Sequence, residues 1–154
     1  MGTRYRDTRL MVYDLGDEFL VRCPRCAAQA RVVPLGADST LPSTFHARCT
    51  CLHCGYQRER HGGDSIVIYH GADWYFGLPV WLQTPCRGHT LWAYNARHLA
   101  FLEDYARATL REAPTGEGWA RNQTLASRLP RWIKSGHHRD DVLAGIERLK
   151  RLLE

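Results

Sequence analysis

Two pairs of cysteines constrain the fold of this chain more than any other feature of its 154 residues. Two residues separate Cys23 from Cys26, and two separate Cys51 from Cys54. A tight turn across each pair would bring both of its sulfurs within reach of one ion, and two such turns supply a tetrahedral site. Four thiolates in this geometry are typical of zinc. We therefore predict that all four cysteines bind a single zinc ion.

Other interpretations of the two pairs are weaker. A redox-active pair usually lies on a turn from a strand to a helix, whereas residues 18–69 have the pattern of strands alone. The cysteines lie in close pairs and are not spread as a disulfide framework. Iron in a four-sulfur site stays open, although zinc is the commoner occupant. Since the chain supplies all four ligands, we expect a structural metal with no position open for a substrate.

Two cysteines remain outside the pairs. Cys49 lies two residues before Cys51 and would share its face in a strand, so it could replace Cys51 as a ligand. Cys86 and His89 have the spacing of a metal-binding pair and could form a second site with Cys49 and His46. An isolated cysteine in an aromatic-rich region is more often a small buried hydrophobic residue, which is the role we favour for Cys86.

The first two thirds of the chain has the pattern of β-strands. Alternating, β-branched or aromatic runs predict strands at 18–23, 31–35, 44–49, 65–69, 80–84 and 90–94, with a loop at 85–89. The first three of these strands flank the cysteine pairs. The 24 residues between Cys26 and Cys51 have room for two strands and a loop, which is the architecture of a zinc ribbon.

From residue 95 the apolar residues recur at helical spacing. Asn95 is a good N-cap for a first helix. Residues 124–134 are helical in pattern, and Pro130 must begin a new segment or kink the old one. A last helix opens at Asp140 or Asp141, where acidic side chains match the helix dipole.

These elements predict an α+β fold. An N-terminal zinc ribbon with an antiparallel sheet is extended by an aromatic-rich β segment, and about three short helices follow. We place a zinc-ribbon β domain at residues 1–94 and a helical region at residues 95–154. Because each helix has one apolar stripe to bury, we expect the helical region to pack on the β domain.

The aromatic centre of the chain has two interpretations. Its members are Trp74, Tyr75, Phe76, Trp81, Trp92 and Tyr94. Exposed rings could form a platform on which nucleic-acid bases stack. Aromatic residues also dominate small cores, and we favour a core. We expect Trp74, Tyr75 and Trp81 to be the exposed exceptions.

The charge of the chain is mildly basic. The formal net charge of +5 becomes +3 when four thiolates (−4) hold a zinc ion (+2). Guanidinium groups suit phosphates, so we predict phosphate contacts from basic residues in both halves of the chain. The candidates are Arg25, Arg48, Arg58, Arg60, Arg121, Arg128, Arg131, Lys134 and Arg139. A solvated helix face explains the C-terminal members of this set equally well.

Motifs for catalysis are absent from the sequence. It has no phosphate-binding loop, glycine-rich dinucleotide motif or nucleophile elbow. Cys86 and His89 could supply a nucleophile and a base, but their spacing says little about geometry, and we nominate no catalytic residue. We expect a non-enzymatic, nucleic-acid-binding or transcription-associated module. The alternative is a protein-interaction adaptor that does not bind nucleic acid, and an enzyme is the least favoured class.

The sequence also bears on the compartment. Residues 1–18 contain several charged side chains and no apolar run of the length that a secretory signal needs. No stretch reaches the ~18 apolar residues of a membrane-spanning helix. The closely paired cysteines favour a reducing environment. We therefore expect a cytoplasmic protein that does not enter the membrane.

Five segments carry a resemblance to a known family. They are FLVRCPRC at 19–26, CLHCGY at 51–56, WYFGLPVWLQTPC at 74–86, LWAYN at 91–95 and SRLPRWIKS at 127–135. In these segments, which cover most of the chain, the sequence resembles uncharacterised bacterial proteins that contain a TFIIB-type zinc ribbon. The resemblance implies a zinc ribbon. It implies no transcription-factor activity, because the family's label rests on the metal motif.

Overall fold

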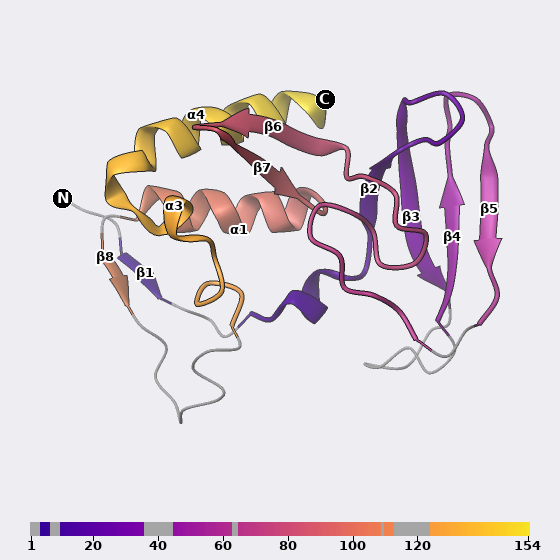
Figure 1. The fold of residues 1–154 in the computed structure, drawn as a ribbon, viewed down its shortest axis with the longest axis horizontal. Coiled ribbons are helices and arrows are strands. Elements are labelled where there is room, and N and C mark those ends of the chain that lie inside the picture. Colours follow the sequence, from indigo (N-terminus) through magenta and orange to yellow (C-terminus); the bar gives the residue numbers. More distant parts are fainter. Residues whose placement is uncertain (1–3, 7–9, 36–44, 63–64, 109, 113–123) are drawn as a thin grey trace. The chain divides into compact units, whose positions relative to one another are not determined.

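The computed structural model describes residues 4–6, 10–35, 45–62, 65–108, 110–112 and 124–154. These residues have the predicted α+β fold, with a four-stranded antiparallel sheet near the N-terminus, smaller two-stranded sheets and three helices toward the C-terminus (Figure 1). The chain divides into two compact units. The sheet unit contains residues 16–83 and 92–95, and the helical unit contains residues 1–15, 84–91 and 96–154. The predicted domain boundary at residues 94 and 95 stays a prediction.

The sheet unit is built on four strands that follow one another in sequence and in space. They are β2 (Phe19–Arg22), β3 (Gln29–Leu35), β4 (His46–Thr50) and β5 (Gln57–Arg60). The sheet order is β2-β3-β4-β5, and every neighbouring pair is antiparallel. The two cysteine pairs lie in the β2–β3 and β4–β5 connections, at the same end of the sheet (Figure 1).

Alternation along the strands separates a buried face from an exposed face. Phe19 pairs with Val32, and Val32 pairs with Cys49, which places one fully buried row across three strands. On the opposite face, Arg31 of β3 and Arg48 of β4 are exposed.

Aromatic rings fill the core behind the buried face. The ring of Phe19 meets those of Trp74 and Tyr94 edge-on, with centroids 4.9 and 5.5 Å away. Trp74 and Tyr75 are only 4% and 8% exposed, so the prediction that they are exposed is wrong. Trp81 is half-buried. Burying these large rings stabilises a small unit more than displaying them would.

One buried carboxylate shapes the loop that brings the aromatic residues into the core. Asp73 is fully buried, and its side chain accepts hydrogen bonds from the backbone N–H groups of Tyr75, Phe76 and Leu78 at 2.7–2.8 Å. Three donors directed at one carboxylate compensate for much of its lost hydration. Asp73 therefore holds the turn in which Trp74 and Tyr75 point inward.

Two strand assignments differ from the sequence prediction. Residues 65–69 form no strand, and Val67 and Tyr69 remain 52% and 43% exposed. Their β-branched composition is not enough, because a strand requires a partner that supplies hydrogen bonds. Conversely, β5 has the polar sequence QRER, which carries no strand pattern. It forms because β4 offers an edge to which it pairs.

The helical unit contains α1 (Ala96–Arg107), α3 (Arg131–Lys134) and α4 (Arg139–Leu152). Pro130 directly precedes α3, as predicted, and α1 begins after Asn95. Two short 3-10 helices occupy Val12–Leu15 and Gly136–His138. The short strands β1 (Arg4–Arg6) and β8 (Leu110–Glu112) pair in parallel.

A tight turn links the strands β6 (Leu82–Cys86) and β7 (His89–Ala93). Arg87 and Gly88 both have positive φ values, 51° and 78°. Two consecutive residues in this conformation match the two-residue turns that join paired strands. The predicted strands at 80–84 and 90–94 are thus present with shifted bounds, and the connection is shorter than the predicted loop.

Within the described residues, no helix combines the length and the apolar character that crossing a membrane would require.

Candidate metal centre

The two cysteine pairs lie on turns with the same backbone hydrogen bonds. The N–H of Ala27 donates to the carbonyl of Cys23, and the N–H of Gly55 donates to the carbonyl of Cys51, both at 2.9 Å. A second bond runs back across each turn from the first cysteine's N–H, at 2.8 Å in both cases. The chain therefore reverses in the same way twice, and each turn presents both of its cysteines to one point.

The residue after each pair adopts the left-handed backbone conformation. Its φ is 65° at Ala27 and 79° at Gly55. Glycine takes this conformation without steric cost, whereas alanine does not. The two turns therefore have the same geometry, but the first one contains a strained residue.

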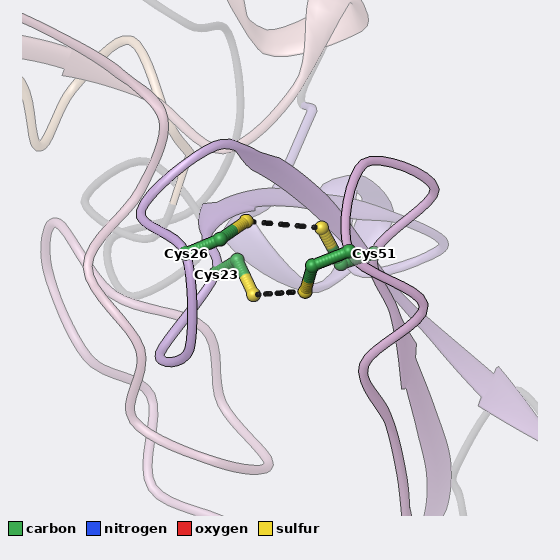
Figure 2. Close-up of side chains that lie close together, drawn as sticks. Cys23, Cys26 and Cys51 are labelled. Carbon is green, nitrogen blue, oxygen red and sulfur yellow. Dashed lines mark hydrogen bonds between the residues drawn. The ribbon is translucent and has the colours of Figure 1, made fainter.

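The four sulfurs form a compact cluster in the described part of the chain. The Sγ atoms of Cys23 and Cys54 are 3.7 Å apart, those of Cys26 and Cys51 are 3.6 Å apart, and all four lie within 4.8 Å of one another. In Figure 2 the sulfurs of Cys23 and Cys26 point toward the turn that carries Cys51. A tetrahedral ion with Zn–S bonds of ~2.3 Å would hold its sulfurs ~3.8 Å apart. The cluster thus has the dimensions of a four-sulfur metal site.

The cluster is shielded on one side. Cys23 and Cys51 are 2% and 1% exposed, whereas Cys26 and Cys54 are half-buried. The backbone N–H of Arg25 lies 3.4 Å from the sulfur of Cys23 and donates to it. N–H donors directed at sulfur favour the thiolate, which is the form that binds a metal.

The ionisation of Cys23 reflects this environment. Burial disfavours its thiolate, but backbone N–H donors from Cys26 and Arg25, with the side chains of Cys54 and Cys51, outweigh burial and lower its pKa to about 6. Cys23 therefore loses its proton more readily than an ordinary cysteine.

Cys26 has the opposite tendency. The backbone N–H of Ala28 favours its thiolate, but burial and the neighbouring thiols Cys51, Cys54 and Cys23 raise its pKa to about 12. Four sulfurs crowded together cannot all be thiolates without a cation between them. A metal ion that binds here must displace protons, so its affinity should increase with pH.

Cys49 is not part of the cluster. It is fully buried on β4, and the side chains that approach one another are those of Cys23, Cys26, Cys51 and Cys54. Burial, together with the nearby Asp73 and Cys23, raises the pKa of its thiol to about 11. Cys49 is thus a small neutral core residue, and the suggestion that it replaces Cys51 is wrong.

The structure does not assemble the suggested second metal site. Among the described residues, the four paired cysteines form the only group of metal-binding side chains close enough to share an ion. The thiol of Cys86 is buried, and it donates to the backbone carbonyl of Asp141 at 3.6 Å. The ring of His89 stacks on Trp132, with centroids 4.7 Å apart and planes 4° from parallel.

The arginines predicted to contact phosphate in the sheet unit have different surroundings. Arg25 is exposed on the first cysteine turn. Arg48 is exposed and pairs with Glu59 at 2.7 Å.

Arg58 lies over the ring of Phe76, 5.5 Å from its centroid. Arg60 donates hydrogen bonds to the carbonyls of Gly62, Ser65 and Tyr75. The guanidinium of Arg60 is therefore already bonded to backbone carbonyls of the chain that follows β5.

In the helical unit, some of the residues predicted to contact phosphate are exposed, and others donate hydrogen bonds to backbone carbonyls. Arg128 and Arg131 are exposed. The ammonium of Lys134 donates to the carbonyl of Ser127 at 2.5 Å. The guanidinium of Arg139 donates to two carbonyls at the end of α1, those of Ala106 and Ala108, at 3.1 and 3.2 Å. Arg121 lies outside the described residues. Phosphate binding by these residues stays a prediction.

Sequence reasoning passed over two exposed arginines of the sheet, Arg22 and Arg31. The strand pairing places both of them on the exposed face of the sheet. Their position relative to Arg48 depends on the register between strands, and no local pattern specifies that register.

The chain was compared with protein-family models, curated proteins and solved structures, and none of them matches it.

Proposed function

We propose that this chain is a zinc-ribbon protein whose four paired cysteines bind one structural Zn²⁺. The observation that carries the proposal is the cluster of four sulfurs, with contacts of 3.6 and 3.7 Å across two matching turns. Zinc prefers four-sulfur sites of this kind, and iron is the alternative that a test must separate from it.

The role of the metal would be mechanical. The β2–β3 and β4–β5 connections each contribute one cysteine pair, so an ion between them would join the two hairpins at one end of the sheet. Four protein ligands would leave no position for water or substrate. Metal binding at such sites contributes on the order of 10 kcal/mol to folding.

The metal assignment is tested by metal analysis of protein purified without added metal. We expect one zinc per chain and no visible absorption from ferric thiolate. In the Cys23→Ser variant we expect weakened metal binding and loss of the sheet, because three sulfurs cannot complete the tetrahedron. A matched Cys49→Ser variant should keep its zinc. Iron in place of zinc, or full zinc occupancy in Cys23→Ser, would contradict the assignment.

We also propose that the protein binds nucleic acid. Its support is the positive charge that remains after zinc binding, +3, and the exposed arginines of both units. A protein that neutralises phosphates with such residues should lose affinity steeply as salt increases. The test is binding of the zinc-loaded chain to mixed DNA and RNA oligonucleotides across a salt series. Absence of binding at low salt would refute this part of the proposal.

One observation favours the adaptor as the second candidate. Leu52, between the two cysteines of the second pair, is 95% exposed. An apolar side chain held in water on a metal-fixed turn suits a protein partner with an apolar pocket. If this candidate is correct, Leu52→Asp should leave folding and zinc content unchanged, abolish binding to the partner, and have no effect on a nucleic-acid assay.

A further inference from the structure

The exposed face of the four-stranded sheet carries an ordered row of arginines. Arg22 lies on β2 opposite Gln29, whereas Arg31 lies two residues further along β3. Arg31 pairs with Thr50 of β4, and Arg48 lies two residues from Thr50. Each arginine is therefore the diagonal neighbour of the next, one strand over and two residues along.

This diagonal has a regular spacing. Diagonal neighbours on antiparallel strands lie ~7–8 Å apart. All three arginines are exposed, and the side chains of Arg31 and Arg48 keep 60% and 45% of their accessible surface. Successive phosphates along one strand of B-form DNA have a similar separation, and those of an A-form helix are closer together. The backbone positions that carry the three arginines therefore repeat at a spacing similar to that of phosphates along a B-form strand.

The described strand residues of this face include no Phe, Tyr or Trp ring on which a base could stack. Among these strand residues are Gln29, Thr50 and Gln57, which can donate hydrogen bonds to phosphate or sugar oxygens. Trp74 and Tyr75 of the sheet unit are buried in its core. Single-strand binding relies on exposed rings beside a basic groove. The strands of this face offer the charge without the rings.

Two glutamates partly neutralise the row. Glu18 pairs with Arg31, and Glu59 pairs with Arg48, both at 2.7 Å. Surface pairs of this kind are worth little to stability, so each glutamate can yield its arginine to a stronger anion. Phosphate would compete with both carboxylates.

From these features we infer that the diagonal of Arg22, Arg31 and Arg48 binds the phosphate backbone of duplex DNA. The inference rests on the proposed nucleic-acid function and adds the surface and the form of the ligand. Arg22 also adjoins the cysteine cluster. The zinc complex there would carry a net charge of −2, which a neighbouring arginine would partly neutralise even without DNA. Arg31 and Arg48 lie one and two diagonal steps further from that cluster and test the inference most directly.

The experiment measures binding of the zinc-loaded full chain to a labelled duplex DNA across a salt series. Single-stranded DNA and duplex RNA with the same number of phosphates are compared with it. We expect the duplex DNA to bind most tightly. Arg31→Gln and Arg48→Gln should each weaken binding roughly tenfold. Each should also reduce the slope of log affinity against log salt concentration by ~0.9, the value for one phosphate contact. Arg151→Gln, an equal charge change at an exposed position of α4, should have little effect.

The glutamates provide a gain-of-function test that damage to the fold cannot imitate. Glu18→Gln and Glu59→Gln should each tighten duplex binding severalfold, whereas Glu154→Gln should not. Zinc content and circular dichroism check that each variant is folded. Tighter binding of single strands, or normal binding by both arginine variants, would overturn the inference and leave the nucleic-acid function standing. If the wild-type chain bound none of the probes, the proposed function itself would fail.

Discussion

At the scale of single residues, backbone conformation decides which side chains suit the cysteine turns. Both turns require a left-handed residue after the second cysteine, with a φ of 65° at Ala27 and 79° at Gly55. A side chain at Gly55 would meet no atom within 4 Å, so any penalty there is conformational and not steric. The two positions are therefore natural controls for each other.

We predict that Ala27→Gly stabilises the zinc-loaded protein by up to ~1 kcal/mol and that Gly55→Ala destabilises it by about the same amount. The reason is the cost of the left-handed conformation for a residue with a Cβ atom. Denaturant unfolding at saturating zinc measures both changes. A destabilised Ala27→Gly variant would show that flexibility gained by the unfolded chain outweighs relief of strain.

A single buried histidine should make stability depend on pH. His98 of α1 is 4% exposed, and burial lowers its pKa from 6.5 to about 3. As the pH falls below 6.5, the unfolded chain binds a proton at this position and the folded chain does not. The stabilising contribution present above pH 6.5 is therefore lost progressively toward pH 3, by up to ~1.4 kcal/mol per pH unit.

The measurement compares unfolding of the wild type and His98→Gln between pH 7 and pH 5. Protonation of the cysteine ligands affects both proteins, so only the difference between their slopes reports on His98. We expect the variant to lose less stability than the wild type on acidification. Parallel curves would mean that His98 has the same pKa in both states.

At the scale of elements, close approach of a helix to a strand pair depends on one glycine. Gly145 of α4 is buried, and a Cβ atom at this position would lie 2.8 Å from Leu91 and 3.8 Å from the sulfur of Cys86. Arg148, one turn further along α4, donates hydrogen bonds to Thr84 and Pro85. The helix is therefore held against the β6–β7 turn region by contacts that leave no room for a larger residue.

We predict that Gly145→Val destabilises the protein by ~2 kcal/mol, because overpacking forces Leu91 or the helix to move. Ala144→Val is the matched control, since Ala144 is the exposed neighbour on the same helix. The control should cost only the lower helix propensity of valine, ~0.5 kcal/mol. Thermal unfolding of the two variants measures the difference. A Gly145→Val variant as stable as the wild type would contradict the prediction, because helix propensity by itself favours valine over glycine and only overpacking can cause a loss.

At the scale of the whole molecule, the cysteine cluster and the aromatic core depend on the same four strands. The cysteine pairs join the strands at one end, and Phe19 and Val32 carry the buried face on which the rings pack. If the proposed zinc is bound, its removal releases both turns at once. The core should then lose its fixed packing together with the metal site.

We predict that chelation of the metal abolishes the near-ultraviolet circular dichroism of the aromatic core. Added zinc should restore it, with an affinity that increases with pH because binding displaces thiol protons. Titration with zinc between pH 6 and pH 8 measures both effects. A core signal that persists after complete metal removal would mean that the sheet unit folds without the ion.

The sequence by itself determined what depends on near neighbours in the chain. The spacing of Cys23 and Cys26 specifies a turn, alternation specifies the buried face of a strand, and Pro130 specifies where a helical segment begins. These features predicted the α+β fold and the four cysteines that cluster. Each is encoded within a few residues, so it can be recognised before the chain is folded.

Only the tertiary structure decided what depends on partners distant in sequence. β5 forms because β4 offers an edge, whereas the more β-prone residues 65–69 find none and stay outside the sheet. Trp74 is buried because Asp73 holds its loop over the core. The arginine diagonal exists only through the register of the strands that carry it. Hydrogen-bond partners and strand register are properties of the folded chain, and no local pattern contains them.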